Sequence, residues 1–200
     1  FMVAQSLTGW REYNNDQKDH HSKTVTYGNY LTTGHFGEAI FENWESEFLQ
    51  MASYILLTVW LRQRGSSESK KLTGEEEVDK DPRDSRRRKD VPWPVRRGGI
   101  WLRLYEHSLS LAFIVLFLAA ITLHAVEGTR SYNEEQKQHG SPPVSTGSYV
   151  TTSRFWFESF QNWQSEYLAV GLMVYLSVFL REKGSPESKP VDAPHAETGS

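Results

Sequence analysis

The sequence predicts an all-α fold, a polytopic membrane helical bundle built from two tandem repeats. Three observations predict it: the chain matches itself at an offset of 119 residues, its apolar residues are concentrated in a few uncharged stretches, and its basic residues gather on one side of those stretches. The mean hydropathy is −0.57 and 24% of the residues are charged, an average that resembles a soluble protein. The aromatic residues beside the apolar stretches are instead typical of membrane interfaces.

An internal repeat organises the chain. Residues 9–70 align with residues 128–189 without a gap, and 29 of the 62 aligned positions are identical. The shared motifs include Tyr-Asn-x-x-Gln, Asn-Trp-x-Ser-Glu-x-Leu and Leu-Arg-x-x-Gly-Ser-x-Glu-Ser-Lys, which indicates a duplication. We therefore expect a first repeat over 1–65, a charged linker over 66–99, a second repeat over 100–184 and a disordered tail over 185–200.

Each repeat is expected to begin with a spanning helix. Residues 109–126 contain no acid or base other than His124, and with an extension back to Tyr105 they are long enough to cross a bilayer as a helix. The first repeat should have the same helix before Gly9, but only the letters FMVAQSLT stand there. The sequence is therefore expected to lack most of its first spanning helix.

A second apolar stretch follows in each repeat, over residues 48–61 and 167–180. Fourteen helical residues rise about 21 Å, which is less than a hydrocarbon core of roughly 30 Å. The stretches are therefore either buried helices of a soluble domain or spanning helices that extend toward their N-termini through Trp44 and Trp163. We favour spanning helices. Two per repeat then predict two parallel repeats that share one orientation.

The distribution of basic residues predicts the orientation. Residues 62–103 and the C-terminal segment carry 16 Lys and Arg, whereas the opposite segments carry six. The positive-inside rule places the N- and C-termini and the linker in the cytoplasm. The basic cluster at residues 86–89 predicts contact with anionic lipid rather than nucleic acid, so the lipid bilayer is the expected partner.

Six repeated polar residues precede the second apolar stretches on the opposite, outer side. They form either a packed cap of hydrogen bonds over the outer mouth of the bundle or a surface for a small molecule or a partner. Serine and threonine near residues 32–33 and 151–152 indicate that the next helices begin there. The candidate outer cap comprises Tyr13, Asn14, Gln17, Tyr132, Asn133 and Gln136.

Two repeated carboxylates are the main candidates for a polar site inside the membrane. Glu47 and Glu166 each stand 14 residues before the last apolar Leu, which is about 21 Å along a helix. Ionisable groups at such depth are costly and are functional-site hypotheses. Three roles are open for these carboxylates. They form structural ion pairs with Arg11 and Arg130, they line a proton or cation route, or they lie in the headgroup region and cap helices. The candidate site comprises Glu47, Glu166, Asn43, Asn162, Ser46, Ser165, Arg11 and Arg130.

No reaction-specific constellation stands in the sequence. The chain contains no cysteine, so disulfides and thiolate sites are excluded. His107 and His124 stand 17 residues apart, about 25 Å along one helix, and cannot share one haem or metal ion. No HExxH, GxSxG or Gly-rich phosphate loop is present. The sequence therefore predicts no catalytic residue, no metal site and no cofactor, and a protein that is not an enzyme.

The repeated motifs, together with the run from Lys189 to His195, resemble an uncharacterised bacterial family of small tandem-repeat membrane proteins, catalogued as a domain of unknown function. The resemblance covers nearly the whole chain and departs from the family at the start. It implies a protein of the bacterial cytoplasmic (inner) membrane with four spanning helices. It implies no activity.

Two functions are expected from these observations. The first is a non-enzymatic structural or accessory component that self-associates as a homo-oligomer or joins a larger membrane complex, since small residues such as Gly171 and Ser177 allow close helix contacts. The alternative is a small transporter or a proton- or cation-conducting protein that uses the paired Glu47 and Glu166. A polar cavity that reaches both carboxylates would favour transport, whereas a dry, tied bundle would favour the first function.

Overall fold

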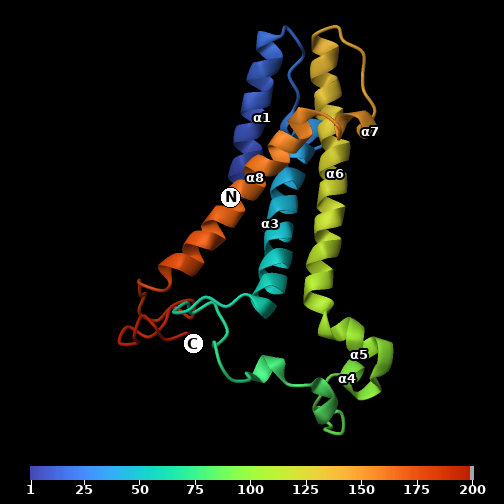
Figure 1. The fold of residues 1–200 in the computed structure, drawn as a ribbon. Helices are drawn as coiled ribbons and strands as arrows, with labels where there is room; N and C mark the ends of the chain where they lie inside the picture. The colour runs from blue at the N-terminus through green and yellow to red at the C-terminus, as the bar shows by residue number, and fades with distance from the viewer. Residues whose placement is uncertain (199–200) are drawn as a thin grey trace. The chain divides into compact units, whose positions relative to one another are not determined.

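The computed structural model describes residues 1–198, and every regular element within them is helical (Figure 1). Four helices are long: α1 (Met2–Asp19), α3 (Gly34–Trp60), α6 (Ser108–Gln138) and α8 (Ser153–Leu176). The predicted all-α class is therefore confirmed. The short elements are α2 (Tyr27–Tyr30), η1 (Glu77–Asp79), η2 (Pro82–Ser85), α4 (Trp93–Arg97), α5 (Gly99–Glu106) and α7 (Thr146–Tyr149).

The chain forms two compact units, and the first combines parts of both sequence repeats. It comprises residues 1–48 and 115–164, whereas the second comprises residues 49–114 and the part of the chain from residue 165 onward. These units differ from the expected division by repeats, because α3, α6 and α8 each contribute to both units. The two outer segments therefore fold together in one unit.

Matched positions of the two repeats make matched contacts in the first unit. The amide of Asn14 donates to the carbonyl of Val25 at 2.9 Å and accepts from its N–H at 2.7 Å. Asn133 makes the same pair of bonds with Val144, at 3.0 and 2.7 Å. Asn133 and Val144 stand 119 residues after Asn14 and Val25, the offset of the repeat. The two outer segments therefore adopt the same local structure.

The starts of α3 and α8 follow the sequence prediction. The hydroxyl of Thr33 accepts the N–H of Phe36 at 3.3 Å, and the hydroxyl of Thr152 accepts the N–H of Phe155 at 3.4 Å. Each threonine thereby satisfies a backbone donor that the first helical turn leaves free. The prediction that these helices begin beside the repeated threonines is confirmed.

Helices α1 and α6 extend further than expected. Both continue through the Tyr-Asn-x-x-Gln motifs, which the sequence analysis placed in polar connecting segments, because the Glu, Gln and Lys residues there are good helix formers. The second residue after each helix is in the left-handed region, His21 with φ 52° and Gly140 with φ 68°. The following N–H then bonds to a carbonyl five residues earlier, as in Schellman caps (Ser22 to Gln17, 2.7 Å; Ser141 to Gln136, 2.8 Å).

Within residues 1–198, α6 is the one helix whose length and apolar composition suffice to cross a membrane. Only 22% of its most apolar window is buried inside the structure. Leu109, Val115 and Leu118 are each more than half exposed. The apolar surface of α6 is therefore mostly unpaired within the described chain, unlike that of a core helix.

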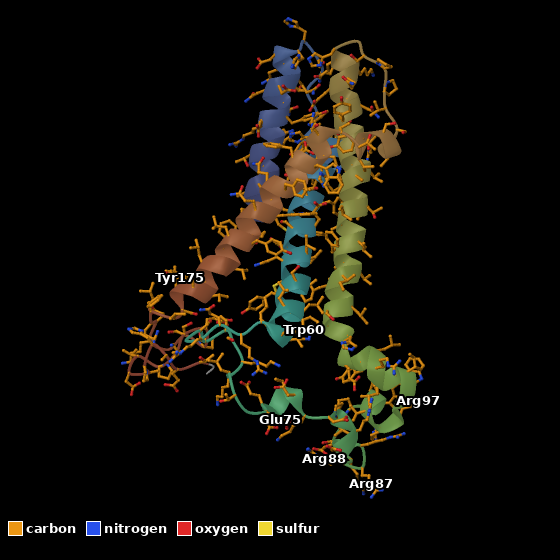
Figure 2. The ribbon with its side chains drawn as sticks, viewed as in Figure 1. Trp60, Glu75, Arg87, Arg88, Arg97 and Tyr175 are labelled. Atoms are coloured by element: carbon orange, nitrogen blue, oxygen red, sulfur yellow. The ribbon has the colours of Figure 1, made fainter. Side chains whose placement is uncertain are left out.

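The second unit contains the linker and the C-terminal segment. Arg86 donates to the carbonyls of Arg96 and Arg97, both at 2.8 Å, and the Arg97 guanidinium lies 5.4 Å from the ring of Trp93. Figure 2 shows this arginine-rich turn through the labelled Arg87, Arg88 and Arg97. The basic segment is thus folded around its own carbonyls and aromatic rings.

The C-terminal segment differs from the expected disordered tail as far as residue 198. Lys189 is 1% exposed, and its ammonium donates to the carbonyls of Pro194, His195 and Glu197 at 3.0 to 3.2 Å. Three carbonyl acceptors replace the water that the ammonium loses, so the segment folds back on itself. The last two residues of the predicted tail lie outside the described residues.

Candidate functional site

The first unit contains a group of ionisable side chains, which we call the buried cluster: Glu38, Glu45 and His124, which are buried, and Glu158, which is half-buried, with Tyr149 beside them. Helix α3 supplies Glu38 and Glu45, α6 supplies His124, and α8 supplies Glu158. The side chains of His124 and Glu45 have no exposed surface. Full burial of ionisable groups is expensive, so their contacts decide what the cluster is able to do.

One side of His124 is fixed by hydrogen bonds and stacking. Its Nδ1 lies 2.9 Å from Oε2 of Glu45, and Oε1 of Glu45 accepts the indole N–H of Trp163 at 3.1 Å. The imidazole also stacks on Phe155, with ring centroids 4.8 Å apart and planes 29° apart. An ionised carboxylate only accepts hydrogen bonds, so the hydrogen between Glu45 and His124 is on Nδ1.

The other side of His124 is not satisfied. Its Nε2 lies 3.6 Å from Oε2 of Glu158, which is too long for a hydrogen bond. Nε2 is buried and has no hydrogen-bond partner among residues 1–198. Buried polar atoms are nearly always paired, so an orphaned ring nitrogen that points at a carboxylate requires an explanation.

A single hydroxyl lies between the two remaining carboxylates. Tyr149 Oη is 2.8 Å from Oε2 of Glu158 and 3.1 Å from Oε1 of Glu38. Burial and these two carboxylates raise the pKa of Tyr149, so the phenol keeps its hydrogen. The hydroxyl has one hydrogen, so it donates to one of these two carboxylates at a time.

Arg154 connects the buried cluster to a cavity. Its Nε donates to Oε1 of Glu158 at 2.8 Å, and its Nη2 donates to Oε1 of Glu135 at 2.9 Å. Glu135 also lines a cavity of about 360 Å³ within the first unit. The cavity carries four carboxylates and three imidazoles, and its lining is Glu12, Tyr13, Asp16, Gln17, His20, His35, Ser131, Glu134, Glu135, Gln138 and His139.

The electrostatics of this acidic cavity affect its buried aromatic and imidazole groups. Burial lowers the pKa of His35, although the carboxylates nearby act in the opposite direction. Burial, together with Glu134, which accepts the hydroxyl of Tyr13 at 3.1 Å, raises the pKa of Tyr13 to about 12. At neutral pH, Tyr13 therefore remains a hydrogen-bond donor in the cavity wall.

The two carboxylates of the predicted membrane site, Glu47 and Glu166, lie in different units of the chain. Glu47 is exposed in the first unit, and among residues 1–198 it forms no ion pair with Arg11 or Arg130. Arg130 instead pairs with Glu127 at 2.7 Å, and Arg11 is exposed. Glu166 is half-buried in the second unit. The buried carboxylate of α3 is Glu45, two residues before Glu47.

The polar neighbours of the predicted pair bond within their own helices. Asn43 donates to the carbonyl of Ala39 at 2.7 Å, and Asn162 donates to that of Glu158 at 3.1 Å. Ser46 is buried and donates to the carbonyl of Asn43 at 2.7 Å, whereas Ser165 is exposed. Each of these three hydrogen bonds joins two residues of one helix.

The six predicted cap residues divide into two groups. Asn14 and Asn133 bind the backbone of the following segment, as a packed cap requires. Tyr13 and Gln17 line the acidic cavity, as a binding surface requires. In the second repeat, the ring of Tyr132 lies 5.5 Å from the Arg154 guanidinium, and Gln136 donates to the Tyr132 hydroxyl at 3.3 Å.

Sequence reasoning missed the buried cluster because it followed the positions that the repeats share. Glu38 and Glu45 align with Phe157 and Gln164, and His124 aligns with Gln5. The available signal was the spacing of Glu38, Glu42 and Glu45, at four and three residues, which places three carboxylates on one helix face. Glu42 is half-buried on that face.

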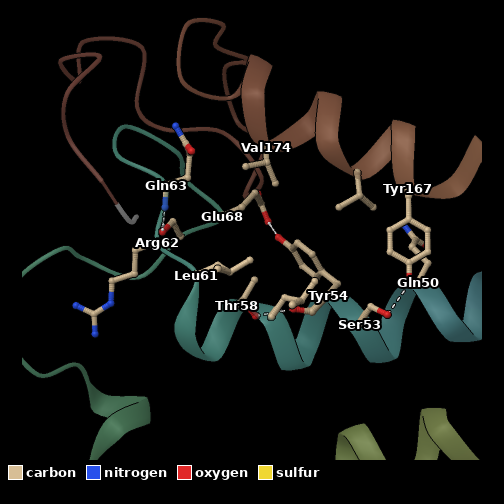
Figure 3. A pocket seen from close by; sticks show the side chains of 13 residues that line it. Gln50, Ser53, Tyr54, Thr58, Leu61, Arg62, Gln63, Glu68, Tyr167 and Val174 are labelled. Atoms are coloured by element: carbon tan, nitrogen blue, oxygen red, sulfur yellow. Dashed lines mark hydrogen bonds between the residues drawn. The ribbon is translucent and has the colours of Figure 1, made fainter. Parts of the chain in front are cut away.

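A second hollow lies in the second unit and is mainly apolar. It has a volume of about 360 Å³ and is lined by residues of α3 and α8, among them Tyr54, Leu57, Tyr167 and Val174 (Figure 3). The hydroxyl of Tyr54 donates to Oε2 of Glu68 at 2.6 Å at its edge. This groove lacks the converging ionisable groups of the buried cluster, so it is the weaker candidate.

Comparison with known proteins places the chain in a family. The chain belongs to the family described as a domain of unknown function (DUF6766), which matches residues 1–200. The prediction of an uncharacterised family is therefore confirmed, and membership assigns no activity. No curated protein and no solved structure matches the chain. The contacts of the buried cluster are therefore the main guide to function.

Proposed function

We propose that this member of the DUF6766 family is an integral membrane protein that binds and passes a cation through the buried cluster of its first unit. The membrane assignment is supported by α6, whose apolar surface is mostly exposed, and by the matching apolar stretches of α3 and α8. The proposed topology has two repeats of two spanning segments each. The basic linker and both termini lie in the cytoplasm of a bacterium.

The single observation that carries the proposed function is the excess of acidic over basic side chains around His124. The carboxylates are the buried Glu38 and Glu45 and the half-buried Glu42 and Glu158. The basic groups beside them are one imidazole and the guanidinium of Arg154, which is shared with Glu135. Carboxylates within a membrane protein are costly unless they are paired, protonated or bound to a cation. A cation supplies the positive charge that the protein's own side chains leave missing.

The acidic cavity is the proposed entrance. It attracts cations through its four carboxylates, and low-dielectric walls strengthen such an attraction. The guanidinium of Arg154 connects this cavity to the buried cluster, because it donates to Glu135 in the cavity wall and to Glu158 in the cluster. This arrangement replaces the route that the sequence suggested through Glu47 and Glu166, since Glu45 and Glu158 are the carboxylates that reach the buried cluster.

The second candidate function is a non-enzymatic accessory component that self-associates or joins a larger membrane complex. It is favoured by the two hydrogen bonds that fill both oxygens of Glu45 and by the bonds that join Arg154 to two carboxylates. Hydrogen-bonded networks of this kind also hold helices in one register. Cation flux distinguishes the two functions, because an accessory component conducts nothing.

The test is cation flux in vesicles that contain the purified full chain. Dyes inside the vesicles report protons, potassium and divalent metal ions, and empty vesicles give the background. We expect flux of one of these cations in the wild type and in Glu47→Gln, and loss of flux in Glu45→Gln and Glu158→Gln. Flux that equals the background in the wild type, or that survives both cluster substitutions, contradicts the proposal and favours the accessory function.

The membrane topology has its own test, because the chain contains no cysteine. A single cysteine at Arg87, an exposed linker position, or at Lys23, an exposed position of the outer segment, is a unique label site. We expect an impermeant thiol reagent to label Lys23→Cys in intact cells and to label Arg87→Cys only after the cells are opened. The reverse pattern contradicts the orientation.

A further inference from the structure

Three ligand atoms of the buried cluster converge on one point in the first unit. One ring nitrogen of His124 and one carboxylate oxygen each of Glu38 and Glu158 all lie within 4.8 Å of one another, and Nε2 is the nitrogen on the side of Glu158. Acidic residues gathered in this way are common without an ion, so their proximity alone assigns nothing. The second, independent observation is the fully buried Nε2 atom, which has no hydrogen-bond partner among residues 1–198 and points at Glu158.

The surroundings of His124 match those of a metal ligand. Imidazole ligands usually donate their other ring N–H to a carboxylate, which fixes the tautomer and raises the basicity of the ligating nitrogen. Glu45 occupies that place at Nδ1, and Trp163 in turn holds Glu45. Phe155 stacks on the ring and limits its rotation. In the neutral ring, Nε2 therefore presents a lone pair on the side of Glu158, and the ring is held in that orientation.

We propose that His124, Glu38 and Glu158 bind one divalent transition-metal ion, with Nε2 and two carboxylate oxygens as ligands. The inference rests on the proposed cation-handling function, since it names the class of the cation. Two carboxylates balance the charge of a divalent ion, and Glu45 and Arg154 remain as the outer layer of the site. Tyr149 bonds to both carboxylates and orients them, without itself being a ligand.

The donor set selects among metal ions. Calcium and magnesium ions take all-oxygen sites, whereas imidazole with carboxylates suits zinc, manganese and iron. Bonds of about 2.0–2.2 Å to zinc separate neighbouring ligand atoms by roughly 3–4 Å, so the three atoms need to close by less than about 1–2 Å. The terminal torsions of the two glutamates are broad and supply this movement. Zinc is therefore the best probe of the site.

The test uses the full chain purified in detergent, stripped of metal and then exposed to zinc in small molar excess. After the unbound metal is removed, elemental analysis gives the zinc content. We expect about one ion per wild-type chain, the number that one three-ligand site holds. The same content is expected in Glu47→Gln, the matched control. His124→Gln and Glu38→Gln are expected to lose the ion.

Cobalt in place of zinc adds a measurement that needs no variant. Its visible absorption bands report ligand geometry, and imidazole ligation of the wild type is readable even where His124→Gln or Glu38→Gln does not fold. A wild type that binds no zinc, or folded His124→Gln that still binds it, overturns the metal site. Proton flux without metal binding would overturn this inference and leave the proposed function standing, whereas metal binding without flux would do the opposite.

Discussion

Glu45 and His124 form a fully buried pair, with 2.9 Å between Oε2 and Nδ1 and no exposed surface on either side chain. The other oxygen of Glu45 accepts the indole N–H of Trp163. Removal of the Glu45 carboxylate therefore leaves two buried donors without an acceptor, the imidazole of His124 and the indole of Trp163. The loss of one partner from a buried pair is costly because the other partner keeps its desolvation penalty.

We expect Glu45→Ala to lower the free energy of unfolding by about 3–5 kcal/mol. Glu47→Ala, two residues away on an exposed part of α3, is expected to change it by no more than about 0.5 kcal/mol. Thermal unfolding in detergent, followed by circular dichroism, measures both variants. Similar losses for the two would show that the buried pair has no special role in stability.

The conservative substitution Glu45→Gln separates stability from metal binding. Glutamine keeps an acceptor for Trp163 but presents no carboxylate to Nδ1, so His124 loses the partner that fixes its tautomer. We expect the affinity for zinc to fall by roughly 10- to 100-fold, as for other outer-layer carboxylates. Zinc titration with a competing chelator measures the change. An unchanged affinity, with the fold intact, would remove Glu45 from the proposed site.

Close packing of α3 on α6 predicts a strong effect at one glycine. A Cβ atom at Gly34 would lie 2.5 Å from the backbone nitrogen of Ser131, which has little freedom to move. We expect Gly34→Ala to destabilise the fold by about 1–3 kcal/mol. Gly28→Ala is the matched control, since nothing lies within 4 Å of its Cβ position. Equal melting temperatures for the two variants would contradict this packing.

His35 predicts a pH dependence of stability. Burial lowers its pKa in the folded state below the unfolded value of about 6.5, so the folded chain binds fewer protons there. The contribution of neutral His35 is fully present above about pH 6.5 and is lost as the pH falls below it. We expect the stability difference between the wild type and His35→Gln to shrink between about pH 7.5 and pH 5. A difference that stays constant would contradict the shift.

The helical class and the starts of α3 and α8 were predictable because they follow from local patterns. Apolar stretches and repeated threonines report on their own segment of chain, and the caps at Thr33 and Thr152 form as expected. The ends of α1 and α6 were not predicted. The composition of Gly128 and the polar residues after it is typical of a connecting segment. The residues around Tyr132 nevertheless have high helix propensity, and α6 continues to Gln138.

The buried cluster could not be predicted from the repeat, for a physical reason. A comparison of the two repeats identifies residues that are the same in both copies, such as Asn14 and Asn133, which bond to the backbone. The cluster instead uses residues in which the copies differ, with His124 from one copy and Glu45 from the other. Only packing of the two copies against each other in the first unit brings these side chains together.

X-ray absorption at the zinc edge of the loaded full chain counts the imidazole ligands of the bound ion. We expect one imidazole nitrogen and otherwise oxygen ligands, at about 2.0–2.2 Å from the ion. A shell with no imidazole would remove His124 from the site. A shell with two imidazoles would indicate that the ion binds in the acidic cavity, where the ring centroids of His20 and His139 lie 5.7 Å apart.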